Sequence, residues 1–153
     1  MGIATSGSVL GTLIGFVVYP TYPNYDSYYS LLWGRELLHG VKPSFDAYRA
    51  PTEHPLAVVF GALLSIVGDP ADRIMVGATL ASFVVLAAGL YRLARASFGT
   101  LVGLAAAGLL CTRFDFPFLA ARAYIDIPYL AFVVWAAALE AERPRRGTVV
   151  FVL

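Results

Sequence analysis

Long uncharged runs alternate with short polar segments along this chain. Three runs of 17 or 18 residues carry no charge, at 3–19, 74–91 and 96–112. The third continues past two charged residues to about 120, and 127–142 forms a fourth, shorter apolar segment. Because about 20 apolar residues in a helix cross a bilayer, the pattern predicts membrane spans at about 3–19, 74–91, 100–120 and 127–142.

A further apolar run begins at residue 148 and includes only six residues, 148–153. A spanning helix needs about 20. We therefore expect the start of another span there, and we expect the chain to be the amino-terminal part of a longer protein.

Residues 20–73 form the one long polar segment, an expected outer loop. Within it, 27–39 is typical of a short amphipathic helix that ends at Gly40. Pro55 suits the first position of a second helix, 55–68. That helix has 14 residues and would reach about 21 Å, against a hydrocarbon thickness of about 30 Å. We expect both helices to lie at the membrane interface without crossing.

The positions of basic residues predict the direction of each span. We expect Arg92 and Arg95 to form one short basic loop and the three arginines of 143–146 the other, and such loops remain on the cytoplasmic side. This places the polar segment 20–73 and the short segment 122–126 outside. An alternative in which the second interfacial helix crosses the membrane would put one of these groups on the wrong side.

Composition supports a membrane protein. Of 153 residues, 59% are hydrophobic and 14% charged, and the mean hydropathy is +0.72. Soluble domains have about 45–50% apolar residues. A net charge of +1 without an interleaved basic patch argues against nucleic acid as a partner, and the single cysteine, Cys111, forms no internal disulfide. The predicted fold class is an all-α, polytopic transmembrane protein with a polar outer loop that carries short juxtamembrane helices.

Asp26 follows the first predicted span by about seven residues and lies among tyrosines. One interpretation is an N-cap for the helix that follows, since Asp is a preferred cap. The other is a carboxylate held just above the membrane, where it accepts a proton from the hydroxyl of an acceptor molecule. Spacing alone leaves both open.

Arg49, Glu53 and His54 precede the helix that Pro55 opens. The free N–H groups of a helix start favour anions, so a cation, a carboxylate and an imidazole there could hold a phosphate or a divalent metal ion. The alternative is a polar loop whose charges are solvated. One histidine and one carboxylate match no zinc motif.

Arg122 and Asp126 come just before the last predicted span. If Arg143 marks the cytoplasmic end of that span, Asp126 lies 17 residues, about 25 Å, further along the helix, slightly below the outer membrane surface. An acid at that depth usually faces a wet cavity and has a partner, and Arg122 is the expected one. The alternative is a structural ion pair that caps the helix.

Four motifs in order resemble a known family: NYDSYYSLLWGRELLHGVKP, PTEHPL, LYRLARASFG and ARAYIDIPY. Together they resemble the C-type membrane glycosyltransferases that use polyprenyl-phosphate sugars. The protein O-mannosyltransferase and aminoarabinose transferase group is the most similar, with the actinobacterial polyprenol-phosphate-mannose-dependent mannosyltransferases. The resemblance implies that Asp26 is catalytic, that Glu53 and His54 bind metal or lipid phosphate, and that Asp126 is a second outer-loop acid. Asp26 is followed by Ser27, where many relatives have a second acid.

The resemblance implies an enzyme of the prokaryotic plasma membrane whose site lies on the outer face. A sugar, mannose or another hexose or pentose, would pass with inversion from a polyprenyl-phosphate donor to a hydroxyl of a lipid, glycan or protein acceptor. His54, Arg49 and Arg122 would hold the leaving phosphate, with a divalent metal ion as a candidate cofactor. We expect the amino-terminal part to be inactive alone. A transporter or flippase and a non-catalytic membrane subunit are the alternative functions.

Overall fold

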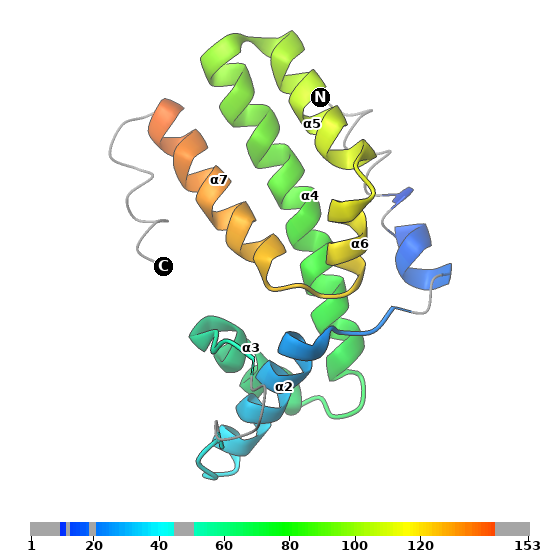
Figure 1. Ribbon diagram of the computed structural model, residues 1–153, viewed down its shortest axis with the longest axis vertical. Coiled ribbons are helices and arrows are strands. Elements are labelled where there is room, and N and C mark those ends of the chain that lie inside the picture. The colour runs from blue at the N-terminus through cyan, green and yellow to red at the C-terminus, as the bar shows by residue number, and fades with distance from the viewer. Residues whose placement is uncertain (1–9, 12, 19–20, 45–50, 143–153) are drawn as a thin grey trace.

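The computed structural model describes residues 10–11, 13–18, 21–44 and 51–142. Every regular element in this part of the chain is a helix, which confirms the predicted all-α class (Figure 1). Residues 10–11 and 13–18 are helical. The helices that follow are α2 (Tyr25–Leu38), α3 (Pro55–Ser65), α4 (Ala71–Phe98), α5 (Thr100–Thr112), α6 (Asp115–Ala121) and α7 (Asp126–Glu142).

The central element is α4, which packs against α7 on one side and against α5 and α6 on the other (Figure 1). Its buried side chains recur at helical spacing, and it contributes more residues to the hydrophobic core than any other helix, at Met75, Val76, Leu80, Phe83 and Leu86. Near its far end, Gly89 makes room for Trp135 of α7, whose indole nitrogen donates a hydrogen bond to the Val85 carbonyl at 2.7 Å.

The predicted basic loop at Arg92 and Arg95 is wrong, because both residues belong to α4. The helix continues to Phe98 and ends at Gly99, whose φ of +94° favours glycine. Arginine is a good helix former, so two arginines do not end a helix. With 28 residues, α4 is about 42 Å long, more than the hydrocarbon thickness of a bilayer.

The segment predicted as one span at 100–120 is two helices, α5 and α6, which bend by 61° where they meet. The break falls at Arg113 and Phe114, where the proline-bearing sequence FDFPF begins. Arg113 and Asp115 form an ion pair of 3.1 Å there, with side chains 67% and 66% exposed. A surface pair of this kind contributes little to stability.

The two short helices of the polar segment, α2 and α3, pack against each other at the end of the molecule where α4 begins (Figure 1). Their backbones touch at Gly34 and Gly61, where an added Cβ would lie 2.2 Å from the Ala62 nitrogen and 2.3 Å from the Ser30 carbonyl oxygen respectively. Helix α2 begins two residues earlier than predicted, and it ends as predicted before Gly40, whose φ is +72°.

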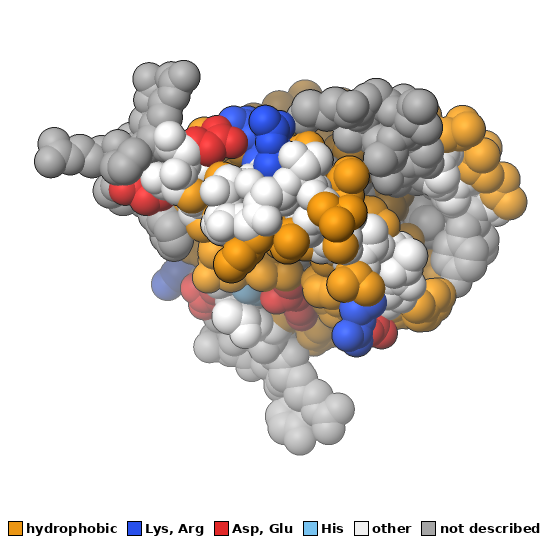
Figure 2. Space-filling model, turned by 90° about the horizontal axis from the view of Figure 1, so that it is seen from above, with side chains coloured by type: hydrophobic (Ala, Val, Ile, Leu, Met, Phe, Trp, Pro, Cys, Tyr) orange, Lys and Arg blue, Asp and Glu red, His pale blue; other side chains and the backbone are white. Residues whose placement is uncertain are grey.

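The two helices leave apolar side chains uncovered. On α2 the buried residues are Ser27, Ser30, Trp33 and Gly34, whereas the apolar Leu32 and Leu38 are about half exposed. Helix α3 opens with Pro55 as predicted but ends at Ser65, and its length of 11 residues, about 16 Å, is too short to cross a bilayer. In Figure 2 apolar side chains cover wide areas of the surface, and charged ones form small separate groups.

Within the described residues, α4 is the one helix long and apolar enough to cross a membrane, and α5 with α6 passes only as a bent pair. Helix α7 begins at Asp126, one residue before its predicted start. The first predicted span lies partly outside the described residues, and residues 143–153 lie wholly outside them. Several crossings of the membrane therefore stay a prediction.

Candidate functional site

The turn between α6 and α7 docks on the start of α2. The backbone N–H of Asn24 donates to the Arg122 carbonyl at 2.7 Å, and the Ser27 hydroxyl donates to the Ala123 carbonyl. Ser27 is fully buried. Hydrogen bonds thus join two polar segments that lie almost 100 residues apart in sequence.

The docked turn has a strained backbone. Ala123 has a φ of +53°, and the Ala123 and Tyr124 amides donate to the carbonyls of Ala120 and Leu119 at 3.1 and 3.0 Å. This is a Schellman ending of α6 with alanine at the position that glycine usually takes. A left-handed alanine costs about 1–2 kcal/mol. Ala123 is 1% exposed, and its carbonyl accepts a hydrogen bond from the Ser27 hydroxyl. These contacts with α2 offset the cost of the left-handed backbone.

The N-cap of α2 is Asn24, not Asp26. The Asn24 side-chain oxygen accepts the Ser27 amide at 3.0 Å, which is the usual bond of a cap. Asp26 instead lies in the first turn, where a carboxylate complements the positive end of the helix. It is half-buried, and its carboxylate accepts no hydrogen bond from the described part of the chain. The capping interpretation of Asp26 is therefore wrong.

The expected ion pair between Arg122 and Asp126 does not form. The Arg122 guanidinium carbon lies 3.7 Å from the centre of the Tyr22 ring instead. Its Nε is buried and has no hydrogen-bond partner in the described structure. Asp126 is the exposed first residue of α7. Arg122 therefore holds a partly buried positive charge that an anion could neutralise, close to the start of α2.

Glu53 and His54 lie at the start of α3. His54 is the N-cap residue of α3 but makes no side-chain cap bond, and Glu53 is exposed. Helices α2 and α3 cross where Gly34 and Gly61 touch the opposite backbone. In the described part of the chain no hydrogen bond, ion pair or ring contact joins Glu53 or His54 to Asp26 or Arg122. Arg49 lies outside the described residues.

No known protein family, curated protein or solved structure matches this chain. Among the described histidines, cysteines and acids, no three come together as metal ligands. Glu53 and His54 alone offer two donors, so a divalent ion held there would take its other ligands from water or a bound phosphate, and the metal ion stays a prediction.

A residue absent from the sequence-based prediction fixes the segment that leads into α2. Arg73, in the first turn of α4, donates to the Thr21 hydroxyl and to the Phe16 carbonyl, both at 3.0 Å. Its guanidinium carbon also lies 4.5 Å from the centre of the Phe16 ring. Arg73 therefore holds the end of the first helical segment and the start of 21–24 against α4. In the sequence, this role is indicated only by a charged residue just before a long apolar run.

Proposed function

We propose that this protein is a membrane glycosyltransferase that transfers a sugar from a polyprenyl-phosphate donor to a hydroxyl acceptor. The observation that carries the proposal is the docking of the Arg122–Ala123 turn on the first turn of α2. It brings a carboxylate without a hydrogen-bond partner, Asp26, and an arginine without an acid partner to one junction. A base and a cation are the two groups that displacement of a lipid phosphate needs.

In the proposed reaction the acceptor hydroxyl oxygen attacks the anomeric carbon of the sugar as its proton passes to the Asp26 carboxylate. The bond between the anomeric carbon and the phosphate oxygen breaks, and polyprenyl phosphate leaves with the bonding electrons. Arg122 stabilises the charge that grows on the phosphate. Attack from the side opposite the phosphate inverts the configuration at the anomeric carbon.

The Tyr22 ring has a positioning role in this proposal. It lies under the guanidinium at 3.7 Å and so restricts the orientation of Arg122, while the edges of the planar group remain available to a phosphate. Tyr22 is itself 49% exposed, which leaves the stacked pair accessible from the surface.

Exposed apolar side chains on α2 and α3 support a lipid donor. Leu56, Val59 and Leu63 on α3 are 58–64% exposed, and Tyr28 and Leu32 on α2 are about half exposed. Such side chains are stable in contact with lipid, and a helix that is too short to cross the bilayer can lie at its interface. A donor with its sugar phosphate at the membrane surface and its hydrocarbon chain in the bilayer would contact these apolar side chains.

The transporter alternative predicts pairs of broken helices with acids at mid-depth. The described residues contain one broken pair, α5 and α6, and the charges at its break, Arg113 and Asp115, are exposed and neutralise each other. Asp26 and Arg122 lie toward one end of the helices instead. This favours chemistry at a surface over passage through the middle.

The test of this function compares two donors with the full-length protein in membranes. We expect transfer of radiolabelled sugar from a polyprenyl-phosphate donor and none from the corresponding nucleotide sugar. The product should carry the anomeric configuration opposite to that of the donor. Transfer from the nucleotide sugar alone, or a product with the donor's configuration, would contradict the proposal.

A further inference from the structure

Four residues, Thr21 to Asn24, lead into α2, and two arginines contact them. The Tyr22 ring lies 3.7 Å from the Arg122 guanidinium carbon, and the Asn24 amide donates to the Arg122 carbonyl at 2.7 Å. The second arginine is Arg73 of α4, whose Nη1 donates to the Thr21 hydroxyl at 3.0 Å. These four residues therefore connect the first turn of α4 to the arginine of the candidate site.

Arg73 also holds the backbone before these four residues. Its Nη2 donates to the Phe16 carbonyl at 3.0 Å, and its guanidinium carbon lies 4.5 Å from the centre of the Phe16 ring. In a helix this carbonyl accepts from the amide four positions later, but that residue is Pro20, which has no amide hydrogen. The bond from Arg73 takes the place of the helical one. The planar fork of arginine bonds both oxygens at once, whereas a lysine offers a single charged nitrogen.

The Tyr22 ring depends on its backbone for its position. It is 49% exposed, and in the described part of the chain Arg122 is the one group stacked on it. Its two neighbours are fixed, since Thr21 is 6% exposed and bonded to Arg73, and Pro23 is fully buried. Loss of the bonds from Arg73 would therefore let the ring move away from the guanidinium.

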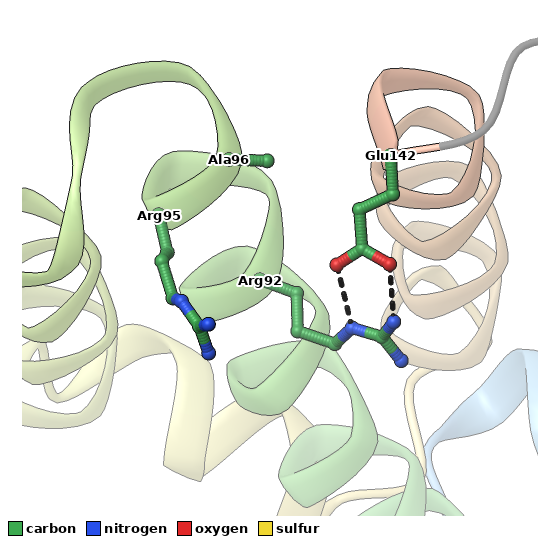
Figure 3. A pocket seen from close by; sticks show the side chains of 4 residues that line it. All are labelled: Arg92, Arg95, Ala96 and Glu142. Atoms are coloured by element: carbon green, nitrogen blue, oxygen red, sulfur yellow. Dashed lines mark hydrogen bonds and ion pairs between the residues drawn. The ribbon is translucent and has the colours of Figure 1, made fainter.

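Toward the other end of α4 lies an arginine with similar contacts but no connection to Tyr22. Arg92 donates through Nε to Glu142 Oε1 at 3.0 Å and through Nη2 to the other oxygen of that carboxylate (Figure 3). Its guanidinium carbon lies 4.9 Å from the centre of the Trp135 ring. Because 19 residues separate it from Arg73, about 28 Å along the helix, Arg92 provides a matched control.

We propose that Arg73 is a positioning residue for Arg122. Its bonds to Thr21 and Phe16 set the place of the Tyr22 ring, and the ring sets the orientation of the guanidinium that would receive the donor phosphate. Arg73 acts only through Tyr22 and contacts neither donor nor acceptor. Its role in sugar transfer rests on the proposed function, whereas its effect on Arg122 itself does not.

The first measurement is the rate at which phenylglyoxal, a reagent for guanidinium groups, modifies Arg122 in the detergent-purified full-length protein, followed by mass spectrometry of its peptides. Arg73→Gln should make Arg122 react about threefold faster, because the released guanidinium loses a cation–π contact of that strength. Tyr22→Leu should give the same rise, and Arg73→Gln should add nothing in the Tyr22→Leu background. The control Arg92→Gln should leave the rate at the parent value.

A milder pair of variants gives a result even where Arg73→Gln does not fold. Thr21→Val removes the hydroxyl that Arg73 binds and keeps the shape of the side chain, so it should raise the Arg122 rate. Thr21→Ser keeps the hydroxyl and should react as the parent does. Melting temperatures measured alongside separate a change at Arg122 from a general loss of stability.

The second measurement is sugar transfer. Because Arg122 acts on charge that grows as the phosphate leaves, Arg73→Gln should lower kcat by the same factor as Tyr22→Leu, with the KM of the acceptor unchanged. An unchanged Arg122 rate in Arg73→Gln and Thr21→Val, or additive effects of Arg73→Gln and Tyr22→Leu, would overturn the positioning role. No transfer by the parent protein would contradict the proposed function, and the phenylglyoxal rates would still decide the role of Arg73.

Discussion

Replacement of Gly34 by alanine should separate α2 from α3. The new Cβ would lie 2.2 Å from the Ala62 nitrogen and 2.6 Å from the Val58 carbonyl oxygen, so the helices must move apart by more than 1 Å to restore ordinary contact. Overpacking costs about 1–3 kcal/mol, and alanine in a helix returns up to about 1 kcal/mol relative to glycine. Because the clash is with backbone, we expect a net loss of about 2 kcal/mol.

The assay is denaturant unfolding in detergent, followed by tryptophan fluorescence. Trp33 is 1% exposed beside Gly34, so its fluorescence reports on the helix pair directly. The chain has two tryptophans, and a Trp135→Phe background leaves Trp33 as the only fluorescent one. The matched control is Gly108→Ala in α5, where an added Cβ meets no atom within 4 Å. That variant should be as stable as the parent or slightly more so. Equal stability of Gly34→Ala and the control would refute the close crossing of α2 and α3.

Two further predictions concern the junction and the direction of the helices. Ser27→Ala removes the hydroxyl bonded to the Ala123 carbonyl and should lower the free energy of unfolding by about 1 kcal/mol; an unchanged value would mean that the turn is not docked. A single cysteine at Asp69, in a Cys111→Ala background, should react with a membrane-impermeant maleimide added outside, whereas one at Ser97 should react only from the cytoplasmic side. Labelling of the Asp69 position from the cytoplasm alone would contradict the expected topology.

Local signals in the sequence predicted several helix ends correctly. Gly40 ends α2 because its positive φ allows the Val41 amide to reach the Glu36 carbonyl at 2.8 Å and the Gly40 amide to reach Leu37 at 3.0 Å. Pro55 begins α3 because the first helical position needs no amide donor. Each of these ends depends on residues within one turn of each other, which a sequence displays directly.

The prediction from sequence was wrong where charged residues were taken to indicate a loop. Arg92 and Arg95 continue α4 because arginine favours helix, and the true signal for the end is Gly99. The start of α2 was also misjudged, since both Asn24 and Asp26 are good caps and only the bond to the Ser27 amide distinguishes them.

The candidate site itself depends on contacts between distant segments. Arg122 was expected to pair with Asp126, four residues away, but it stacks on Tyr22, which lies 100 positions earlier in the chain. The Gly34–Gly61 crossing likewise joins two helices where glycines let the backbones touch. Hydrophobic periodicity does not specify such partners, because a glycine adds no side chain to the apolar pattern.

The most direct test of the central claim is the rate of sugar transfer from the polyprenyl-phosphate donor by Asp26→Asn. A general base contributes about 100-fold to 10,000-fold, so we expect at least a 100-fold fall in rate with the protein still folded. The control is Asp69→Asn, the same change at an exposed acid between α3 and α4, which should transfer sugar at the parent rate. Transfer by Asp26→Asn at the rate of that control would contradict the catalytic role of Asp26.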